Sequence, residues 1–251
     1  MEVKEAIEVT EAMAVTDASA VADVTDESPA ARRGPHIVWD WNGTLLHDID
    51  AVILATNASF AEFGFAPITL ETYRELYVVP VPKFYERLMG RMPTEAEWLV
   101  MDETFHRHYW SSAETAGLAE GALELLRGWQ GAGSTQSLLS LAPHDKLVPL
   151  VRTHGIDTHF LRVDGRTGPS HTTKAGHLVR HMAAMAAAGV TADRTVLIGD
   201  AVDDALAAAH VGARAVLYTG GSHSRSSLES AGVPVVDTLA EAVATAREMA
   251  E

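Results

Sequence analysis

Predicted strands and helices alternate along the second half of the chain, and this alternation limits its possible folds more than any other feature. The strands are short, continuous apolar runs such as Thr195–Gly199, and each is followed by a segment whose apolar residues recur at helical spacing. Strands that are apolar on both sides belong to parallel sheets that helices cover on both faces. The sequence therefore predicts a Rossmann-like α/β core in three layers, with a parallel sheet in the middle.

The same pattern places the elements of this core. We expect strands at His36–Trp39, Thr135–Ser140, Phe160–Val163, Thr195–Gly199, Ala213–Tyr218 and Val233–Val236. We expect helices at Gly121–Trp129, His144–His154, Thr172–Ala188, Asp203–His210, Ser224–Ala231 and Leu239–Ala250. In sheets of this kind, ligands bind outside the carboxyl ends of the strands.

A long insertion separates the first two strands. More than 90 residues lie between Trp39 and Thr135, whereas parallel strands are commonly joined by a crossover of a dozen residues or more. No strand is expected in residues 46–119, and helices are expected at Asp50–Phe63, Glu71–Tyr77, Lys83–Met89 and 94–111. We therefore expect a helical cap at residues 47–119, inserted between core segments at residues 35–46 and 120–251.

The first 34 residues differ from the rest of the chain. Their apolar residues are small and scattered, and acidic residues outnumber basic ones. This composition is typical of a disordered tail, which we expect at residues 1–34. A frayed helix over Val3–Met13 is the alternative interpretation.

The composition excludes several classes of function. A net charge of −15 provides no basic surface for a nucleic-acid backbone, so nucleic acid is not an expected partner. The absence of cysteine excludes disulfides and thiolate nucleophiles. No apolar run is long enough to span a membrane, and no signal peptide is recognisable. We expect a cytoplasmic protein that does not bind membranes; the oligomeric state is not predicted by any of these features.

Polar side chains follow the predicted strands at the edge where ligands would bind. They are Asp40, Ser140, Asp200, Asp203 and Asp204, together with Lys174 near the start of a helix. Several carboxylates held together need a cation, and oxygen ligands without histidine or cysteine suit Mg²⁺. Each residue alone has an ordinary explanation as a turn, a helix cap or a solvated side chain. Their order and spacing together point to a site.

Two histidines spaced four residues apart require separate consideration. His177 and His181 lie in a predicted helix at a spacing that puts both on one face, where a metal ion could be held. A lone pair of this kind is weak support for a metal site, and we interpret it as part of a solvated helix face.

The motifs occur in an order that resembles the haloacid dehalogenase superfamily of phosphohydrolases, in the branch similar to phosphoglycolate phosphatases. The motif Asp-x-Asp-Gly-Thr-Leu after an apolar strand is similar to Val38–Leu45, with Asn42 in place of the second Asp. Leu138–Ser140 is similar to the second motif, and Lys174, followed by Ala175 rather than Pro, to the third. Ile198–Asp204 is similar to the fourth. The resemblance covers residues 36 to 248, and its first and fourth motifs are the specific ones.

The resemblance implies a phosphatase mechanism. Asp40 would attack phosphorus and form an aspartyl-phosphate that water then cleaves. Mg²⁺ would be held by the Asp40 and Asp200 carboxylates and by the backbone carbonyl of Asn42, with support from Asp204 or, as the alternative, Asp203. The transferring phosphate of a small phosphorylated metabolite would be held by Gly43, Thr44, Ser140 and Lys174.

Asn42 departs from the family pattern. The Asp expected there protonates the leaving alcohol and later activates water, and an amide has no proton to exchange at neutral pH. General acid–base help is worth about 10²–10⁴ in rate, so the sequence predicts a slow phosphatase or one that favours good leaving groups. His47 and His144 are candidates to replace the missing acid.

Two other functions remain open from the sequence. The first is a binding protein that keeps a Mg²⁺–phosphate pocket without turnover, in which Asn42→Asp would create activity. The second is another reaction of the same superfamily, either carbon–halogen cleavage or phosphonate cleavage with Lys83 as a Schiff base. The acidic cluster at Asp200–Asp204 conflicts with metal-independent dehalogenation.

Overall fold

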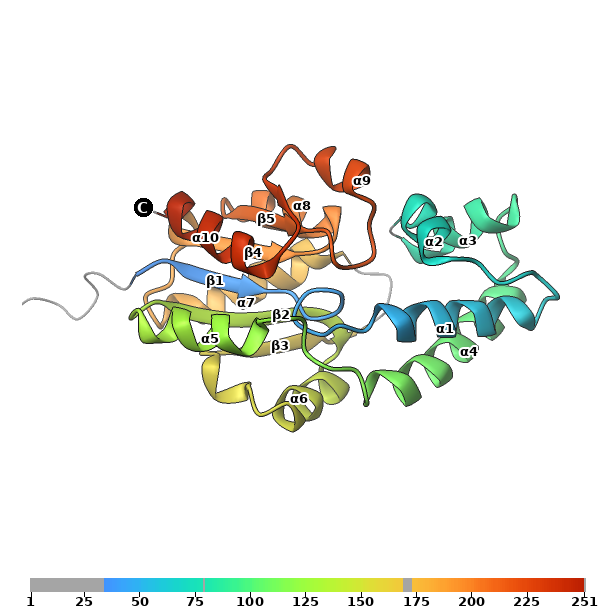
Figure 1. Ribbon diagram of the computed structural model, residues 1–251, viewed down its shortest axis with the longest axis horizontal. Helices are drawn as coiled ribbons and strands as arrows, with labels where there is room; N and C mark the ends of the chain where they lie inside the picture. Colours follow the sequence, from blue (N-terminus) through green and yellow to red (C-terminus); the bar gives the residue numbers. More distant parts are fainter. Residues whose placement is uncertain (1–33, 79, 169–172, 251) are drawn as a thin grey trace, which may run out of the picture. The chain divides into compact units, whose positions relative to one another are not determined.

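The computed structural model describes residues 34–78, 80–168 and 173–250 (Figure 1). The tail expected at residues 1–34 lies outside the described residues apart from Gly34. Within the described residues, no helix combines the length and the apolar character that crossing a membrane requires.

Six parallel strands form the central sheet, in the order β3-β2-β1-β4-β5-β6. The strands are β1 (His36–Trp39), β2 (Thr135–Pro143), β3 (Val163–Arg166), β4 (Thr195–Gly199), β5 (Arg214–Tyr218) and β6 (Val235–Val236). Trp39 of β1 pairs with Leu138 of β2 and with Ile198 of β4. The chain therefore leaves three neighbouring strands at the same edge, and the strand order reverses there, as in other open α/β sheets that bind ligands.

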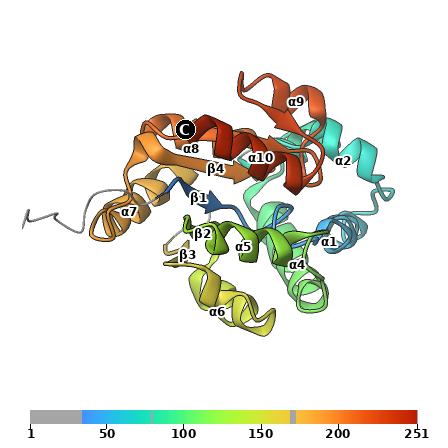
Figure 2. The same ribbon diagram turned by 60° about the vertical axis from the view of Figure 1, so that its left-hand side comes forward.

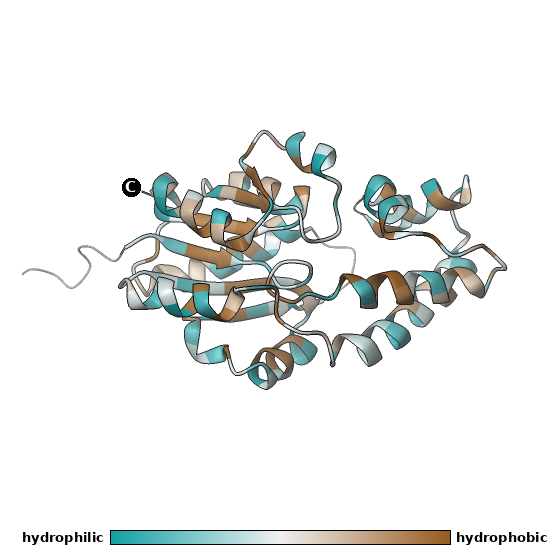
Figure 3. Ribbon diagram, viewed as in Figure 1, coloured by the Kyte–Doolittle hydropathy of each residue, from teal (hydrophilic) through white to brown (hydrophobic). Residues whose placement is uncertain are grey.

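Helices cover both faces of this sheet (Figure 2). On one face lie α5 (Ala122–Gly131), α6 (His144–Thr153) and α10 (Leu239–Ala250). On the other lie α7 (Lys174–Ala186) and α8 (Val202–His210), with the short α9 (Arg225–Glu229) contributing Leu228. The central strands are mainly hydrophobic, whereas the covering helices show both colours (Figure 3). The predicted three-layer α/β core is confirmed.

The third strand differs from its prediction. It runs over Val163–Arg166, whereas Phe160–Val163 was expected from its apolar residues. Residues Asp157–His159 form a 3-10 turn that ends at Phe160, and Phe160 packs against the apolar core below the sheet. Because β3 is an edge strand with one neighbour, polar residues can occupy it, and apolar content does not locate it.

Four helices fill the insertion between β1 and α5. They are α1 (Ile49–Ala61), α2 (Leu70–Leu76), α3 (Val81–Met89) and α4 (Glu95–Ala113). They bury an apolar cluster of their own, which includes Phe60, Tyr73 and Met101. Thr94 starts α4 with a capping box, because its hydroxyl accepts from the Glu97 N–H while the Glu97 carboxylate accepts from the Thr94 N–H. We refer to residues 47–119 as the proposed cap.

Candidate active site

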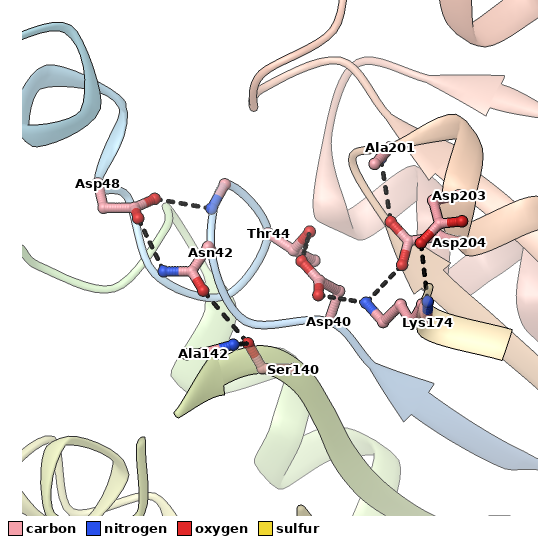
Figure 4. A network of polar contacts seen from close by, with 11 residues as sticks. Asp40, Asn42, Thr44, Asp48, Ser140, Ala142, Lys174, Ala201, Asp203 and Asp204 are labelled. Atoms are coloured by element: carbon pink, nitrogen blue, oxygen red, sulfur yellow. Dashed lines mark hydrogen bonds and ion pairs between the residues drawn. The ribbon is translucent and has the colours of Figure 1, made fainter. Parts of the chain in front are cut away.

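The edge of the sheet brings the predicted polar residues together, and Figure 4 shows Asp40, Ser140, Lys174, Asp203 and Asp204 among them. Asp40 follows β1, and its N–H donates to the carbonyl of Ile198, 2.9 Å away, in the neighbouring strand. Ser140 lies within β2, which was expected to end there but continues to Pro143. The pairing of β2 with β3 shifts register between Leu139 and Pro143, so Ser140 lies at an irregularity of the strand rather than at its end.

Lys174 lies between two buried carboxylates. Its Nζ forms ion pairs with Asp40 and Asp204, and all three side chains are buried. Burial alone would lower the pKa of Lys174, but the charges of Asp204 and Asp40 outweigh this effect, so its pKa is raised. The ammonium therefore stays charged and balances the nucleophile candidate at any pH near neutrality.

The Asp40 carboxylate has a shifted pKa of its own. Burial raises its pKa to about 6, and the nearby charge of Asp204 adds to this effect, while Lys174 opposes it. The Thr44 hydroxyl donates to its Oδ2 at 3.2 Å. A second cation beside Asp40 would keep the carboxylate ionised at lower pH.

Three carboxylates converge at this point in the described residues. One oxygen each of Asp40, Asp200 and Asp204 lies within 4.8 Å of the others, and all three residues are buried. Burial and the charges of Asp40 and Asp204 raise the pKa of Asp200 well above its usual range. Such a cluster of oxygen donors, short of positive charge, fits a hard cation such as Mg²⁺.

Two glycines make room for Asp200. A Cβ on Gly43 would lie 2.5 Å from Asp200 Oδ2, and one on Gly221 would lie 2.0 Å from the same atom. Gly43 also has a φ of +70°, which side-chain-bearing residues rarely adopt. The Asn42–Gly43 turn is therefore needed to let the loop after β1 approach the acid cluster.

Asp203 and Asp204 have different roles at the start of neighbouring helices. The Asp203 carboxylate accepts from the backbone N–H of Lys174 at 3.0 Å, which fixes the beginning of α7. Asp204 Oδ2 accepts from the Ala201 N–H at 3.0 Å, and its other oxygen meets Lys174 Nζ. Of these two residues, Asp204 belongs to the carboxylate cluster found in the described residues, and Asp203 does not.

The Asn42 amide makes three hydrogen bonds. Its Nδ2 donates to Asp48 Oδ2 at 2.9 Å and to the Tyr109 hydroxyl at 2.5 Å. Its Oδ1 accepts from the Ser140 hydroxyl at 3.2 Å. The Ser140 oxygen in turn accepts from the Ala142 N–H at 3.0 Å.

Asp48 and Tyr109 are site residues that the sequence analysis missed. The two oxygens of Asp48 accept from the Gly43 N–H at 2.7 Å and from the Tyr109 hydroxyl at 2.7 Å. Burial raises the pKa of Asp48, and the bonds from Tyr109 and Asn42 oppose this. Asp48 had a sequence signal, as a second carboxylate shortly after the first motif. Tyr109 had none, because it reaches the loop from α4.

The comparisons with known proteins support the same interpretation of the chain. Residues 37–209 match the profile of the haloacid dehalogenase-like hydrolases. The chain belongs to this family. A phosphoglycolate phosphatase of Pseudomonas fluorescens is 26% identical over 211 residues, which cover 81% of this chain and 76% of that protein. A 5'-nucleotidase of Pseudomonas aeruginosa is 25% identical over 188 residues, which cover 73% of this chain and 81% of that protein.

Solved structures of the family share the fold. The structure of a haloacid dehalogenase family hydrolase from Deinococcus radiodurans, with bound phosphate and sodium, superposes with a TM-score of 0.63. It is 19% identical and covers 86% of this chain and 96% of its own. At this level of identity the likeness confirms the haloacid dehalogenase-like architecture.

In the present chain, α2 is one part of the proposed cap that contacts the core. Arg74 donates from Nε to the Gly221 carbonyl at 2.8 Å and from Nη2 to the Gly220 carbonyl at 3.0 Å. The Ser224 N–H donates back to the Arg74 carbonyl at 3.2 Å. The same loop positions Asp200, whose Oδ2 accepts from the Ser222 N–H at 2.6 Å.

The interpretation of His177 and His181 as a solvated face is wrong, because both side chains are buried. The two residues lie on one face of α7, and His181 contacts β2 through Ser137. His181 Nδ1 contacts Asp164 Oδ2 at 2.8 Å, and its Nε2 contacts the Ser137 hydroxyl at 2.7 Å. His36 Nε2 contacts the same hydroxyl oxygen at 2.8 Å. His36, Ser137 and His181 form a buried polar network that extends to the half-buried Asp164.

Both histidines considered as replacement acids are exposed, and their role stays a prediction. His144 is exposed, and its Nδ1 accepts from the Gly165 N–H at 3.1 Å, which directs the ring toward β3. His47 is exposed to solvent. Lys83, the candidate for phosphonate cleavage, is exposed on α3.

Proposed function

We propose that this hydrolase is a Mg²⁺-dependent phosphatase that acts on a small organic phosphate through an aspartyl-phosphate on Asp40. The observation that carries the proposal is the buried Asp40, ion-paired with Lys174 and flanked by Asp200 and Asp204. The names of the related proteins agree with the reaction class, because phosphoglycolate phosphatases and 5'-nucleotidases both cleave phosphomonoesters.

In the first step the Asp40 carboxylate forms a bond to phosphorus, and the bond from phosphorus to the substrate oxygen breaks. The electron pair of that bond goes to the leaving oxygen. Lys174 reduces the repulsion between the anionic nucleophile and the anionic phosphate. Water then attacks the phosphorus of the aspartyl-phosphate and regenerates Asp40.

Ser140 and Lys174 are the residues best placed to hold the phosphate. The Ser140 oxygen is anchored by the Ala142 N–H, and its O–H can rotate from Asn42 toward a phosphate oxygen. Gly43 and Thr44 were also expected to bind phosphate. The Gly43 N–H already donates to Asp48, and the Thr44 N–H donates to the Trp41 carbonyl at 3.3 Å, so we assign these residues to the shape of the loop.

The carboxylates of Asp40 and Asp200 and the backbone carbonyl of Asn42 would hold Mg²⁺, with Asp204 in support. When bound, the ion would offset the negative charge that gathers where nucleophile and phosphate meet. The support for this assignment is the raised pKa of Asp200, whose carboxylate lies among other carboxylates without an ion-pairing Lys or Arg in the described part of the chain.

A screen for phosphate release tests the proposal. Freshly prepared protein, shown by peptide mass spectrometry to carry Asn at position 42, is assayed with Mg²⁺ on an aryl phosphate and on a panel of metabolite phosphates. We expect the aryl phosphate to turn over faster than alkyl phosphates, because Asn42 supplies no proton to a poor leaving group. Asp40→Asn should abolish release, whereas Asp193→Asn, the same change at an exposed and distant site, should not. Release at equal rates from wild type and Asp40→Asn would refute the proposal.

A binding protein without turnover is the second candidate, and the amide at position 42 is the observation that favours it. This candidate predicts that Mg²⁺ and inorganic phosphate together raise the melting temperature while no substrate releases phosphate.

A further inference from the structure

We propose that Asn42 and Asp48 act as one matched amide–carboxylate pair in which the two groups are exchangeable, so that the loop after Asp40 accepts a carboxylate at position 42 or at position 48. The Tyr109 hydroxyl, in the proposed cap, hydrogen-bonds to both members of the pair. Asp48 is thus a positioning residue for the loop that follows the nucleophile. The kinetic part of this inference rests on the proposed phosphatase function, and the structural part does not.

The hydrogen bonds fix the polarity of the pair. An ionised carboxylate can only accept hydrogen bonds, so the Asn42 Nδ2 must face Asp48 Oδ2 at 2.9 Å. The Asn42 Oδ1 must then face the Ser140 hydroxyl, which donates to it (Figure 4). Asp48 therefore determines which end of the amide points toward the phosphate-binding serine.

Asp48 is held by neutral donors alone in the described structure. Its side chain is 2% exposed, and no Lys or Arg among the described residues forms an ion pair with it. The donors are the Gly43 N–H, the Asn42 amide and the Tyr109 hydroxyl. Burying a carboxylate is costly unless such donors are present. The burial of Asp48 therefore depends on the hydrogen bonds from residues 42, 43 and 109.

A simple capping role does not account for Asp48. It precedes α1 at the N-cap position, but its side chain makes no capping hydrogen bond to that helix. Both oxygens are directed instead at the loop after β1 and at Tyr109, 61 residues away in α4.

The pair has a direct consequence for substitutions at position 42. Asn42→Asp alone would place a second carboxylate oxygen about where Nδ2 lies, 2.9 Å from Asp48 Oδ2. Two carboxylates this close cannot both be ionised at low cost. Restoring the family motif by this single change therefore creates a conflict inside the loop.

The double variant Asn42→Asp with Asp48→Asn satisfies every bond with the polarity reversed. The amide introduced at position 48 would donate from its nitrogen to the carboxylate introduced at position 42, and its oxygen would accept from the Gly43 N–H. The hydroxyls of Ser140 and Tyr109 would donate to the same new carboxylate. The geometry accommodates a carboxylate at either position of the pair, but not at both.

A double-variant cycle tests the inference, with N42D, D48N and N42D/D48N measured beside wild type. Asp50→Asn, an exposed acid two residues further along, is the matched control for loss of a carboxylate. We expect N42D and D48N each to lower the melting temperature by about 5 °C or more, and the double variant to return to within about 2 °C of wild type. Asp50→Asn should leave it unchanged.

Kinetics separate positioning from general stability. In D48N, kcat on an aryl phosphate should fall about tenfold, with KM changed by less than about threefold, at a temperature where the variant is fully folded. Tyr109→Phe should lower kcat in the same direction by a smaller factor. The double variant should turn over an alkyl phosphate at least about tenfold faster than N42D.

If the effects of N42D and D48N on the melting temperature are additive, so that the double variant is the least stable of the four proteins, the two groups are not exchangeable and the inference is wrong. An unchanged kcat in D48N would overturn its positioning role. If wild type releases no phosphate, the proposed function fails, and the melting-temperature cycle still decides the exchange.

Discussion

Lys174 is the residue on which the charge balance of the site depends. It is 4% exposed and pairs with two buried carboxylates, Asp40 and Asp204. Removing one partner of a buried ion pair leaves the other charge uncompensated, which is more costly than the pair itself is stabilising.

Lys174→Met should therefore affect both stability and rate. We expect the free energy of unfolding to fall by about 3–5 kcal/mol in the absence of Mg²⁺. Phosphate release should fall at least about a hundredfold, because the nucleophile and the phosphate then repel each other without a counter-charge. Urea unfolding and a phosphate assay measure these effects, with the exposed Lys146→Met as control. A variant as stable and as active as wild type would show that the buried ion pairs are unimportant.

The sequence reveals the site residues that lie in motifs, but not those that reach the site through long-range contacts. Asp40, Ser140 and Lys174 can be found because Asp40 follows a recognisable strand, Ser140 lies in one and Lys174 opens a helix, in the order of the family motifs. Tyr109 and Arg74 cannot, because their partners lie 61 and 147 residues away along the chain, and no local pattern marks such contacts. Asp48 is an intermediate example. It lies near the first motif in the sequence, but its hydrogen bond with Tyr109 cannot be predicted without the structure.

At the scale of elements, strands and helices of the core are predictable where they are apolar and paired on both sides. β3 is misplaced because an edge strand tolerates polar residues, and the buried face of α7 is misjudged because His177 and His181 are buried with polar partners. Hydrophobicity alone cannot distinguish a satisfied buried histidine from a solvated one.

Arg74 links helix α2 to the core. The Arg74 guanidinium binds two consecutive carbonyls, those of Gly220 and Gly221, in the loop that also positions Asp200 through Ser222. Opening the proposed cap would require these bonds to break.

Arg74→Ala should loosen the cap and weaken substrate binding. We expect KM for an aryl phosphate to rise about threefold to tenfold, because the loop around Asp200 loses its support. Arg87→Ala, which removes one exposed bond to the Leu76 carbonyl within the cap, is the matched control and should leave KM unchanged. Equal effects of the two changes would argue against a specific link between α2 and the loop.

For the whole molecule, Mg²⁺ binding at the acid cluster, as proposed, would make stability depend on both Mg²⁺ and pH. Any ion that binds the folded chain but not the unfolded one raises stability, by about 2.7 kcal/mol at a hundred times its dissociation constant. The pKa of Asp40 is raised to about 6 in the metal-free chain, so protons compete with Mg²⁺ for this carboxylate in acid.

Mg²⁺ should therefore raise the melting temperature at pH 7.5, and EDTA should reverse the effect. The increase should shrink as the pH falls below about 6, because Asp40 is then protonated in the metal-free folded state and the ion must displace that proton. Differential scanning fluorimetry at several pH values measures this, with Asp200→Asn as a variant that should lose most of the response. An equal increase in Asp200→Asn would place the ion elsewhere.

The central claim is that Asp40 attacks phosphorus, and the covalent product can be observed directly. Because Asn42 provides no general base for the attacking water, the aspartyl-phosphate should accumulate during turnover of an aryl phosphate. Acid quenching followed by peptide mass spectrometry should find one phosphoryl group on the peptide that contains Asp40, and none on that peptide in Asp40→Asn. Release of phosphate with no phosphoryl group on Asp40 at any quench time would contradict the account.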